Sequence, residues 1–365
     1  MAEKQRRSLT LYGPHLKRGS DEHHDEVRGQ PWLAKHSHPR ASPIAEVDAM
    51  RLGVGLPATI PGARPEEIIE WARAAERSGF STLGTLDRVV FDNYDPIPVL
   101  AAAAAVTERI GLTTSILIGP YRGNGVVLAK QLASIDLLSR GRLTVGIAVG
   151  NREDDYQATD TSYAGRGAAQ DALLIRMRAV WRGEAQAGGQ VGPHPARPGG
   201  PPLLIGGGLG SGPLLSATRV IRRVLEHGSG WISGGDPRTF ADVAQQVRTA
   251  WEQAGRDGSP RLVSLGYFAL GAGADDAATR YLSRYYAFNA EAADHAMAGA
   301  MTSEAKLTAG IRTFAEAGCD ELILFPCTAD PGQVDHLAPV AADYLDPHSR
   351  PSSWPATTST PHHQS

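Results

Sequence analysis

The feature that most constrains the fold is a regular alternation of short β-branched runs with helical patterns. Strands that are separated by helices pair in parallel, because a parallel connection needs a crossover of a dozen or more residues. Their number predicts a (β/α)₈ TIM barrel, with a doubly wound sheet as the alternative; against that sheet, no GxGxxG turn follows the first run. The runs lie at residues 51–56, 81–86, 112–118, 143–149, 202–206, 230–233, 262–269 and 320–325.

The two ends of the chain differ in composition from this alternating region. Residues 1–49 hold five of the twelve histidines, many charges and few aliphatic side chains, and 347–365 are rich in Ser, Thr, Pro and His. Such segments bury too little apolar surface to become ordered. We therefore expect a disordered N-terminal extension, or translation that starts at Met50, then a barrel over 50–346 and a disordered C-terminal tail.

Two connections between predicted strands are unusually long, 151–201 after the fourth strand and 270–318 after the seventh. Connections that follow strands lie at the C-terminal mouth of a barrel, where active sites are built. We expect these two to select the substrate. Four aromatic residues in the second are expected to form either an apolar wall or a helix packing face, namely Tyr281, Tyr285, Tyr286 and Phe288.

Composition excludes several classes of protein. Apolar residues make up 42% and charged residues 21%, and the formal net charge is −3, so no global field favours nucleic acid or an anionic membrane. No apolar run approaches the roughly 20 residues of a membrane span, and no secretory signal is visible, so we expect a cytoplasmic protein. Cys319 and Cys327 flank one predicted strand, about 26 Å apart at ~3.3 Å per residue, and cannot pair.

The ends of the predicted strands narrow the chemistry. Lys130 and Lys306 fall on helical patterns, so no strand ends in a lysine that could form a Schiff base. The histidines between residues 50 and 346 show neither HxH nor HExxH spacing, which argues against a zinc hydrolase. We expect no metal. Glu153, Asp154 and Asp155 favour a solvated charge run over a magnesium site.

Polar residues and glycines gather where the second, third and fifth strands end. Asp87 and Arg88 follow the second strand. They are expected either to form a surface salt bridge or to belong to a site. The stretch TTSILIGPYRGNG contains the end of the third strand and begins with three hydroxyl residues. In a regular strand such residues would stand in for valine; otherwise they would contribute to a site. The fifth ends in the glycines 206–208 before a helix near Pro213, an arrangement typical of a phosphate cradle.

Taken together, these stretches resemble the bacterial luciferase-like monooxygenase superfamily. The resemblance covers about residues 50 to 345 and is most specific in the block that ends DLLSRGRLTVGIAVG. It implies a (β/α)₈ oxidoreductase that uses a flavin or a deazaflavin. The matching stretches are LTTSILIGPYRGNGVVLAKQLASIDLLSRGRLTVGIAVGNREDDY, PPLLIGGG, GSGWISGG and AGCDELILFP.

The resemblance also implies roles for individual residues. Asp87 and Arg88 match polar catalytic groups near the reactive edge of the cofactor ring, and a non-prolyl cis peptide is implied between Ser115 and Ile116, in a bulge that supports the ring. Arg122 and Arg152 are candidates for anion contacts because of their charge and position. The other residues implied to bind the cofactor are Val149, Gly150, Asn151, Gly206, Gly207, Gly208, Ser211, Ser233 and Gly234.

Two residues depart from the pattern of true luciferases, which carry a histidine in place of Arg88 and a phosphate-binding arginine in place of Val149. Light emission is therefore not implied. We expect a flavin-dependent oxidoreductase or monooxygenase that acts on a small organic substrate with FMN, which a separate flavin reductase would reduce. A deazaflavin coenzyme with hydride transfer, and a non-catalytic flavin-binding barrel, are the alternatives. The alanines 101–105 allow close helix packing, and we expect a homodimer.

Overall fold

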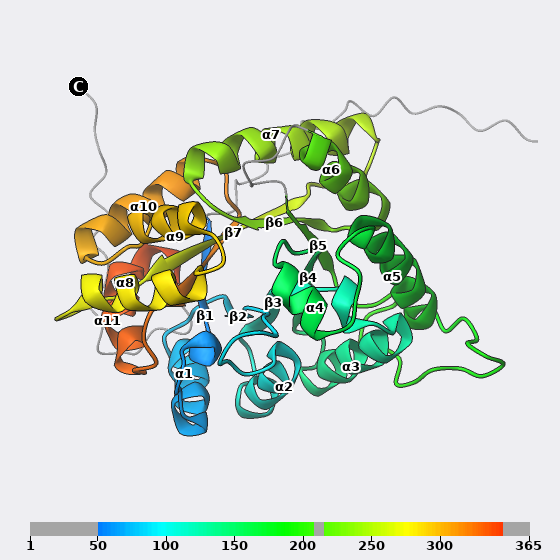
Figure 1. Cartoon of the computed structure of the whole chain (residues 1–365), viewed down its shortest axis with the longest axis horizontal. Helices are drawn as coiled ribbons and strands as arrows, with labels where there is room; N and C mark the ends of the chain where they lie inside the picture. Colours follow the sequence, from blue (N-terminus) through cyan, green and yellow to red (C-terminus); the bar gives the residue numbers. More distant parts are fainter. Residues whose placement is uncertain (1–49, 208–214, 346–365) are drawn as a thin grey trace, which may run out of the picture. The chain divides into compact units, whose positions relative to one another are not determined.

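The structure, a computed structural model, describes residues 50–207 and 215–345. Eight parallel strands close into a barrel in chain order (Figure 1). The predicted barrel is confirmed, and the doubly wound alternative is wrong, because β1 pairs with β8 from Arg51 opposite Glu321 onward. The strands are β1 (Arg51–Gly55), β2 (Thr82–Thr85), β3 (Gly111–Ile118), β4 (Leu143–Ala148), β5 (Leu203–Gly206), β6 (Gly230–Gly234), β7 (Arg261–Phe268) and β8 (Glu321–Pro326).

Helices surround the barrel and join its strands (Figure 1). Asp95 and Asp236 each accept a backbone N–H at the start of a helix whose first residue is proline, which fixes where α2 and α7 begin. The α-helices are α1 (Pro65–Arg77), α2 (Pro96–Val106), α3 (Gly125–Leu138), α4 (Glu153–Ala158), α5 (Arg166–Trp181), α6 (Leu215–His227), α7 (Pro237–Gln253), α8 (Ala274–Tyr285), α9 (Ala290–Ala298), α10 (Glu304–Glu316) and α11 (Gly332–Val340); short 3₁₀ helices lie at Pro57–Thr59, Pro120–Arg122 and Ala342–Tyr344.

The barrel interior is filled from alternate positions of its strands. In β1, Leu52 and Val54 pack against the surrounding helices, whereas Gly55 faces the barrel interior. A Cβ at Gly55 would lie 2.1 Å from the ring of Phe325, so glycine leaves the space that this ring occupies. Phe325 belongs to an interior cluster with Ile232 and Val263.

The long connection after β7 is helical, and its first helix extends the interior core. Tyr281 and Tyr285 of α8 pack in the same apolar cluster as Ile232 and Val263 of β6 and β7. The connection after β4 contains α4 and α5, of which only α4 is additional to the repeating pattern. Helix α8 therefore covers part of the mouth that the sequence predicts to hold the site.

Several predictions concern features other than the barrel itself. Cys319 and Cys327 are free, as predicted, and both are buried. Among the described residues, no helix combines the length and apolarity needed to cross a membrane, and no group of three or more His, Cys, Asp and Glu side chains is placed to hold a metal. The extension 1–49 and the tail 347–365 lie outside the described residues, and their disorder stays a prediction.

Candidate functional site

The third strand contains the bulge that the resemblance implies. The peptide bond between Ser115 and Ile116 is cis, and the pairing of β3 with β4 shifts register between Thr114 and Leu117. The hydroxyl of Thr114 donates to the carbonyl oxygen of Gly146 at 2.7 Å, and that of Ser115 donates to Thr113 O at 3.2 Å. The hydroxyl groups thus satisfy carbonyls around the bulge, and the alternative of a regular strand is wrong.

Beside the bulge, the ends of two strands present backbone without side chains. Ile116 is half-buried, and a Cβ at Gly206 would lie 2.9 Å from its Cδ1 atom. Gly207 has φ +122°, a conformation that side chains rarely adopt, and Gly150 has φ +66°. Glycine at 206 thus leaves the space that Ile116 and Ala148 occupy, and the backbone of Gly207 is of the kind that can approach an anion.

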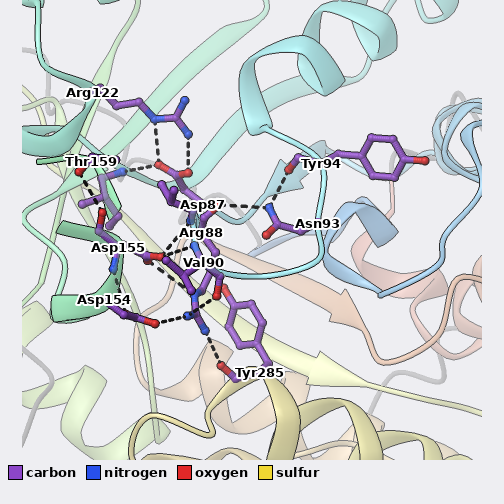
Figure 2. Close-up of polar contacts among 12 residues, drawn as sticks. Asp87, Arg88, Val90, Asn93, Tyr94, Arg122, Asp154, Asp155, Thr159 and Tyr285 are labelled. Atoms are coloured by element: carbon purple, nitrogen blue, oxygen red, sulfur yellow. Dashed lines mark hydrogen bonds and ion pairs between the residues drawn. The ribbon is translucent and has the colours of Figure 1, made fainter. Parts of the chain in front are cut away.

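Asp87 binds the backbone at the end of β3, just after the bulge, and also binds Arg122 (Figure 2). It is 2% exposed, its Oδ2 accepts the N–H of Ile118 at 2.9 Å, and it forms an ion pair with Arg122. Burial raises the pKa of Asp87 even though Arg122 opposes the shift. These contacts give Asp87 a positioning role on β3, and its predicted catalytic role stays a prediction.

Arg122 was predicted to contact an anion of the cofactor. Its guanidinium instead binds two carboxylates of the protein, those of Asp87 and Asp95, the latter at 2.5 Å. Burial lowers the pKa of Arg122, but Asp87 and Asp95 outweigh this and raise it. Arg122 therefore neutralises the buried Asp87 in this structure, which differs from the predicted anion contact.

Arg88 lies next to Asp87 in sequence but has different partners (Figure 2). It is 7% exposed and donates to Asp154 Oδ2 and to the carbonyl oxygens of Val90 and Tyr285, each at 3.0 Å. A surface salt bridge between Asp87 and Arg88 is therefore wrong, because both are buried and neither pairs with the other. Arg88 joins the exit of β2 to α4 and to the end of α8, and its place at the ring's reactive edge stays a prediction.

Asp155 is a site residue that the sequence analysis missed. It is 1% exposed, and its Oδ1 accepts the N–H groups of Val89 at 3.0 Å and Val90 at 2.7 Å. The interpretation of residues 153–155 as a solvated charge run is wrong for Asp155, whose carboxylate fixes the loop after β2. No local signal distinguishes it from Glu153 or Asp154, since its partners lie 65 and 66 residues away.

Arg152 reaches the aromatic residues of the second long connection. Its guanidinium lies 4.9 Å from the ring centroid of Tyr285, 4.7 Å from that of Phe288 and 5.8 Å from that of Tyr286. Tyr286 also shares a 2.8 Å hydrogen bond with Tyr267 of β7, another residue that the sequence analysis did not identify. Tyr281 and Tyr285 form the predicted packing face of α8, whereas Tyr286 and Phe288 follow the helix, and their predicted role as an apolar wall stays a prediction.

The remaining predicted cofactor residues are placed as follows. Val149 accepts a 2.5 Å hydrogen bond from Tyr156 at its carbonyl oxygen, and Asn151 is exposed at the mouth. Ser233 and Gly234 end β6, where the Ser233 hydroxyl donates to Gly234 O at 3.1 Å. Gly208 and Ser211 lie outside the described residues, so only the first two glycines of the predicted phosphate loop can be located. Binding of cofactor by these residues stays a prediction.

Comparison with known proteins gives the family. An uncharacterized protein of Mycobacterium tuberculosis is 29% identical over 180 residues, which span 47% of this chain but only 61% of that relative. The F420-dependent hydroxymycolic acid dehydrogenase of M. tuberculosis is 27% identical over 258 residues, 66% of this chain and 69% of that one. An F420-dependent secondary alcohol dehydrogenase, solved with an F420–acetone adduct, has the same fold, with a TM-score of 0.68 and 17% identity over 82% of this chain and 100% of that one. The model of the luciferase-like monooxygenase family matches residues 49–321, and the chain therefore belongs to this family.

Proposed function

We propose that this protein is an oxidoreductase that uses the deazaflavin coenzyme F420 to transfer hydride to or from a small organic substrate. The observation that carries the proposal is the similarity to the F420-dependent hydroxymycolic acid dehydrogenase, which extends over about two thirds of both chains. From that relative we infer only the coenzyme of this protein. We do not infer the substrate, because the connections that line the mouth differ most between proteins that share a barrel.

The described residues fit a flat coenzyme ring and its phosphate. Ile116, which packs into the space that Gly206 leaves, offers a half-buried apolar surface, and Gly207 has the backbone freedom to approach an anion. When bound, the coenzyme supplies a site that accepts or donates hydride. The protein's part is to hold the ring against the bulge of β3, which Asp87 anchors through Ile118, and to exclude water with α8.

A second candidate function is FMN-dependent monooxygenation, which the description of the matching family model favours. Such an enzyme would receive reduced FMN from a separate flavin reductase. The replacements at Arg88 and Val149 count against the chemistry of true luciferases, since neither residue provides the histidine or the phosphate-binding arginine that the resemblance associates with them.

The test is a pair of titrations on the full-length protein, one with oxidised F420 and one with FMN. We expect F420 to bind at least about tenfold more tightly, which corresponds to ~1.4 kcal/mol. Secondary alcohols are then added to the F420 complex, and loss of the coenzyme's visible absorbance reports its reduction. Tighter binding of FMN would overturn the proposal in favour of the second candidate. Binding of the coenzyme with neither oxidation of an alcohol by oxidised F420 nor reduction of an aldehyde or enone by reduced F420 would favour a non-catalytic barrel.

A further inference from the structure

One half-buried cation at the mouth, Arg152, lacks a polar partner among the described residues. Arg152 makes neither a hydrogen bond nor an ion pair with any described residue, and its Nε atom is inaccessible to solvent. Burial lowers the pKa of Arg152, but the surrounding tyrosines Tyr285 and Tyr286 and the carboxylate of Asp155 raise it overall, so the guanidinium stays charged. A buried N–H donor without a hydrogen-bonding partner is costly, and a guanidinium with no carboxylate partner among the described residues suits an anionic ligand.

The other two arginines of the mouth serve as a comparison. Arg88 is paired with Asp154, and Arg122 is paired with Asp87 and Asp95. Their guanidinium groups are thus committed to carboxylates of the protein. Within residues 50–207 and 215–345, the guanidinium of Arg152 instead lies over aromatic rings, and its terminal N–H groups have no carboxylate partner.

The position of Arg152 separates it from the glycines that fit the coenzyme's phosphate. Its ring partner Tyr285 stacks edge-on against Phe91 of the loop after β2, at 5.2 Å between centroids. The neighbouring Tyr281 hydrogen-bonds to Thr59, after β1, at 2.7 Å. Arg152 therefore extends from β4 toward the β1 and β2 side of the mouth, whereas Gly206 and Gly207 end β5, on the opposite side of β4 in the barrel order.

We propose that Arg152 binds the carboxylate of the substrate, and that the substrate is a small organic acid whose apolar body lies against Tyr286 and Phe288, with the buried Tyr285 behind them. Phe288 is 37% exposed, so this aromatic wall has a face that a ligand can reach. A planar carboxylate matches the two parallel N–H groups of a guanidinium edge, and the stacked rings orient that edge in advance. This proposal rests on the proposed function, since it names the substrate class of the same site.

The experiment compares benzoate with benzamide, its neutral isostere, by calorimetric titration of the full-length protein saturated with F420. We expect wild type to bind benzoate at least about tenfold more tightly, because hydrogen bonds to a charged group exceed those to a neutral one. Arg152→Met should remove this preference and leave the Kd for F420 unchanged. Arg152→Lys should keep part of it. The control is Arg284→Met, which removes an exposed arginine that lies 5.8 Å from the ring centroid of Phe91, and it should bind benzoate like wild type.

Four outcomes would overturn the proposal. Equal affinity of wild type for benzoate and benzamide would show that the mouth does not select an anion. A preference kept by Arg152→Met, or by the neutral Arg152→Gln if the Met variant fails to fold, would assign the anion to another residue. Weaker F420 binding by Arg152→Met with benzoate unaffected would make Arg152 a coenzyme residue. Repeating the titrations with phenyl phosphate tests the carboxylate class, which tighter phosphate binding would contradict. If wild type binds no F420 but still prefers benzoate, the proposed function fails and this inference stands.

Discussion

The single residue that most directly tests the cofactor position is Gly206. A methyl group there would lie 2.9 Å from Ile116 Cδ1 and from Ala148 Cβ, which is closer than side-chain carbons approach. Gly206→Ala should therefore displace Ile116 and weaken binding of the coenzyme about tenfold, since overpacking of this kind costs ~1–3 kcal/mol. A fluorescence titration with F420 measures the change.

Gly189→Ala is the matched control for this substitution. Nothing lies within 4 Å of the Cβ that it adds, and the residue is absent from those with positive φ. Its coenzyme affinity should equal that of wild type. If Gly206→Ala also bound the coenzyme like wild type while melting at the same temperature, Ile116 would not support the ring.

The buried carboxylate of Asp87 gives a prediction about stability. Asp87→Asn leaves a side-chain oxygen for the N–H of Ile118 but removes the negative charge beside Arg122. Breaking a buried ion pair from one side is strongly destabilising, although Asp95 still pairs with Arg122, so we expect a loss of about 2 kcal/mol in the free energy of unfolding. Urea denaturation measures this loss. Asp92→Asn, an exposed aspartate of the same loop, should cost nothing, and equal stability of both variants would refute the positioning role.

At the scale of elements, the start of α7 provides a test with a defined pH dependence. Asp236 accepts the N–H groups of Arg238 at 3.0 Å and Thr239 at 3.1 Å. Asp236→Ala should lower the free energy of unfolding by about 1 kcal/mol at neutral pH, as expected for loss of an N-cap. The control is Asp242→Ala, an exposed position within the same helix, and thermal unfolding compares the two variants.

The pH dependence of the Asp236 cap follows from its charge. Burial raises the pKa of Asp236, but the hydrogen bonds from Thr239 and Arg238 outweigh burial and lower it below the ordinary value of 3.8. A carboxylate whose pKa is lower in the folded state stabilises the fold above its unfolded pKa. The difference between wild type and Asp236→Ala should therefore persist above about pH 4 and disappear as the pH falls through the folded pKa. A difference that grew on acidification would contradict this assignment.

At the scale of the whole molecule, the barrel should not need the first 49 residues. β1 begins at Arg51 and pairs on both sides within the barrel, with β2 and with β8. Residues 1–49 show no periodic pattern that could contribute to a core. A protein that starts at Met50 should keep its melting temperature and its affinity for F420. A clear loss of either would show that the extension packs on the barrel.

The sequence by itself determined the elements and their order. Residues close in the chain share the hydrogen bonds of a strand or helix, so periodicity, caps and glycines report these elements directly, as at Asp95 and Asp236. Counting the runs then predicts a closed barrel. The bulge of β3 followed from the resemblance of the TTSILI stretch to a known family, since no general rule of periodicity identifies it.

Only the tertiary structure decided which side chains meet at the mouth. Adjacent in sequence, Asp87 and Arg88 bind different partners, and Arg88 reaches the carbonyl of Tyr285 across 197 residues. Such pairings depend on closure of the barrel and on where α4 and α8 lie over it, and local sequence encodes neither. For the same physical reason, the structure alone distinguishes Arg88 and Arg122, which pair with the buried carboxylates of Asp155 and Asp87, from Arg152, which lies over aromatic rings.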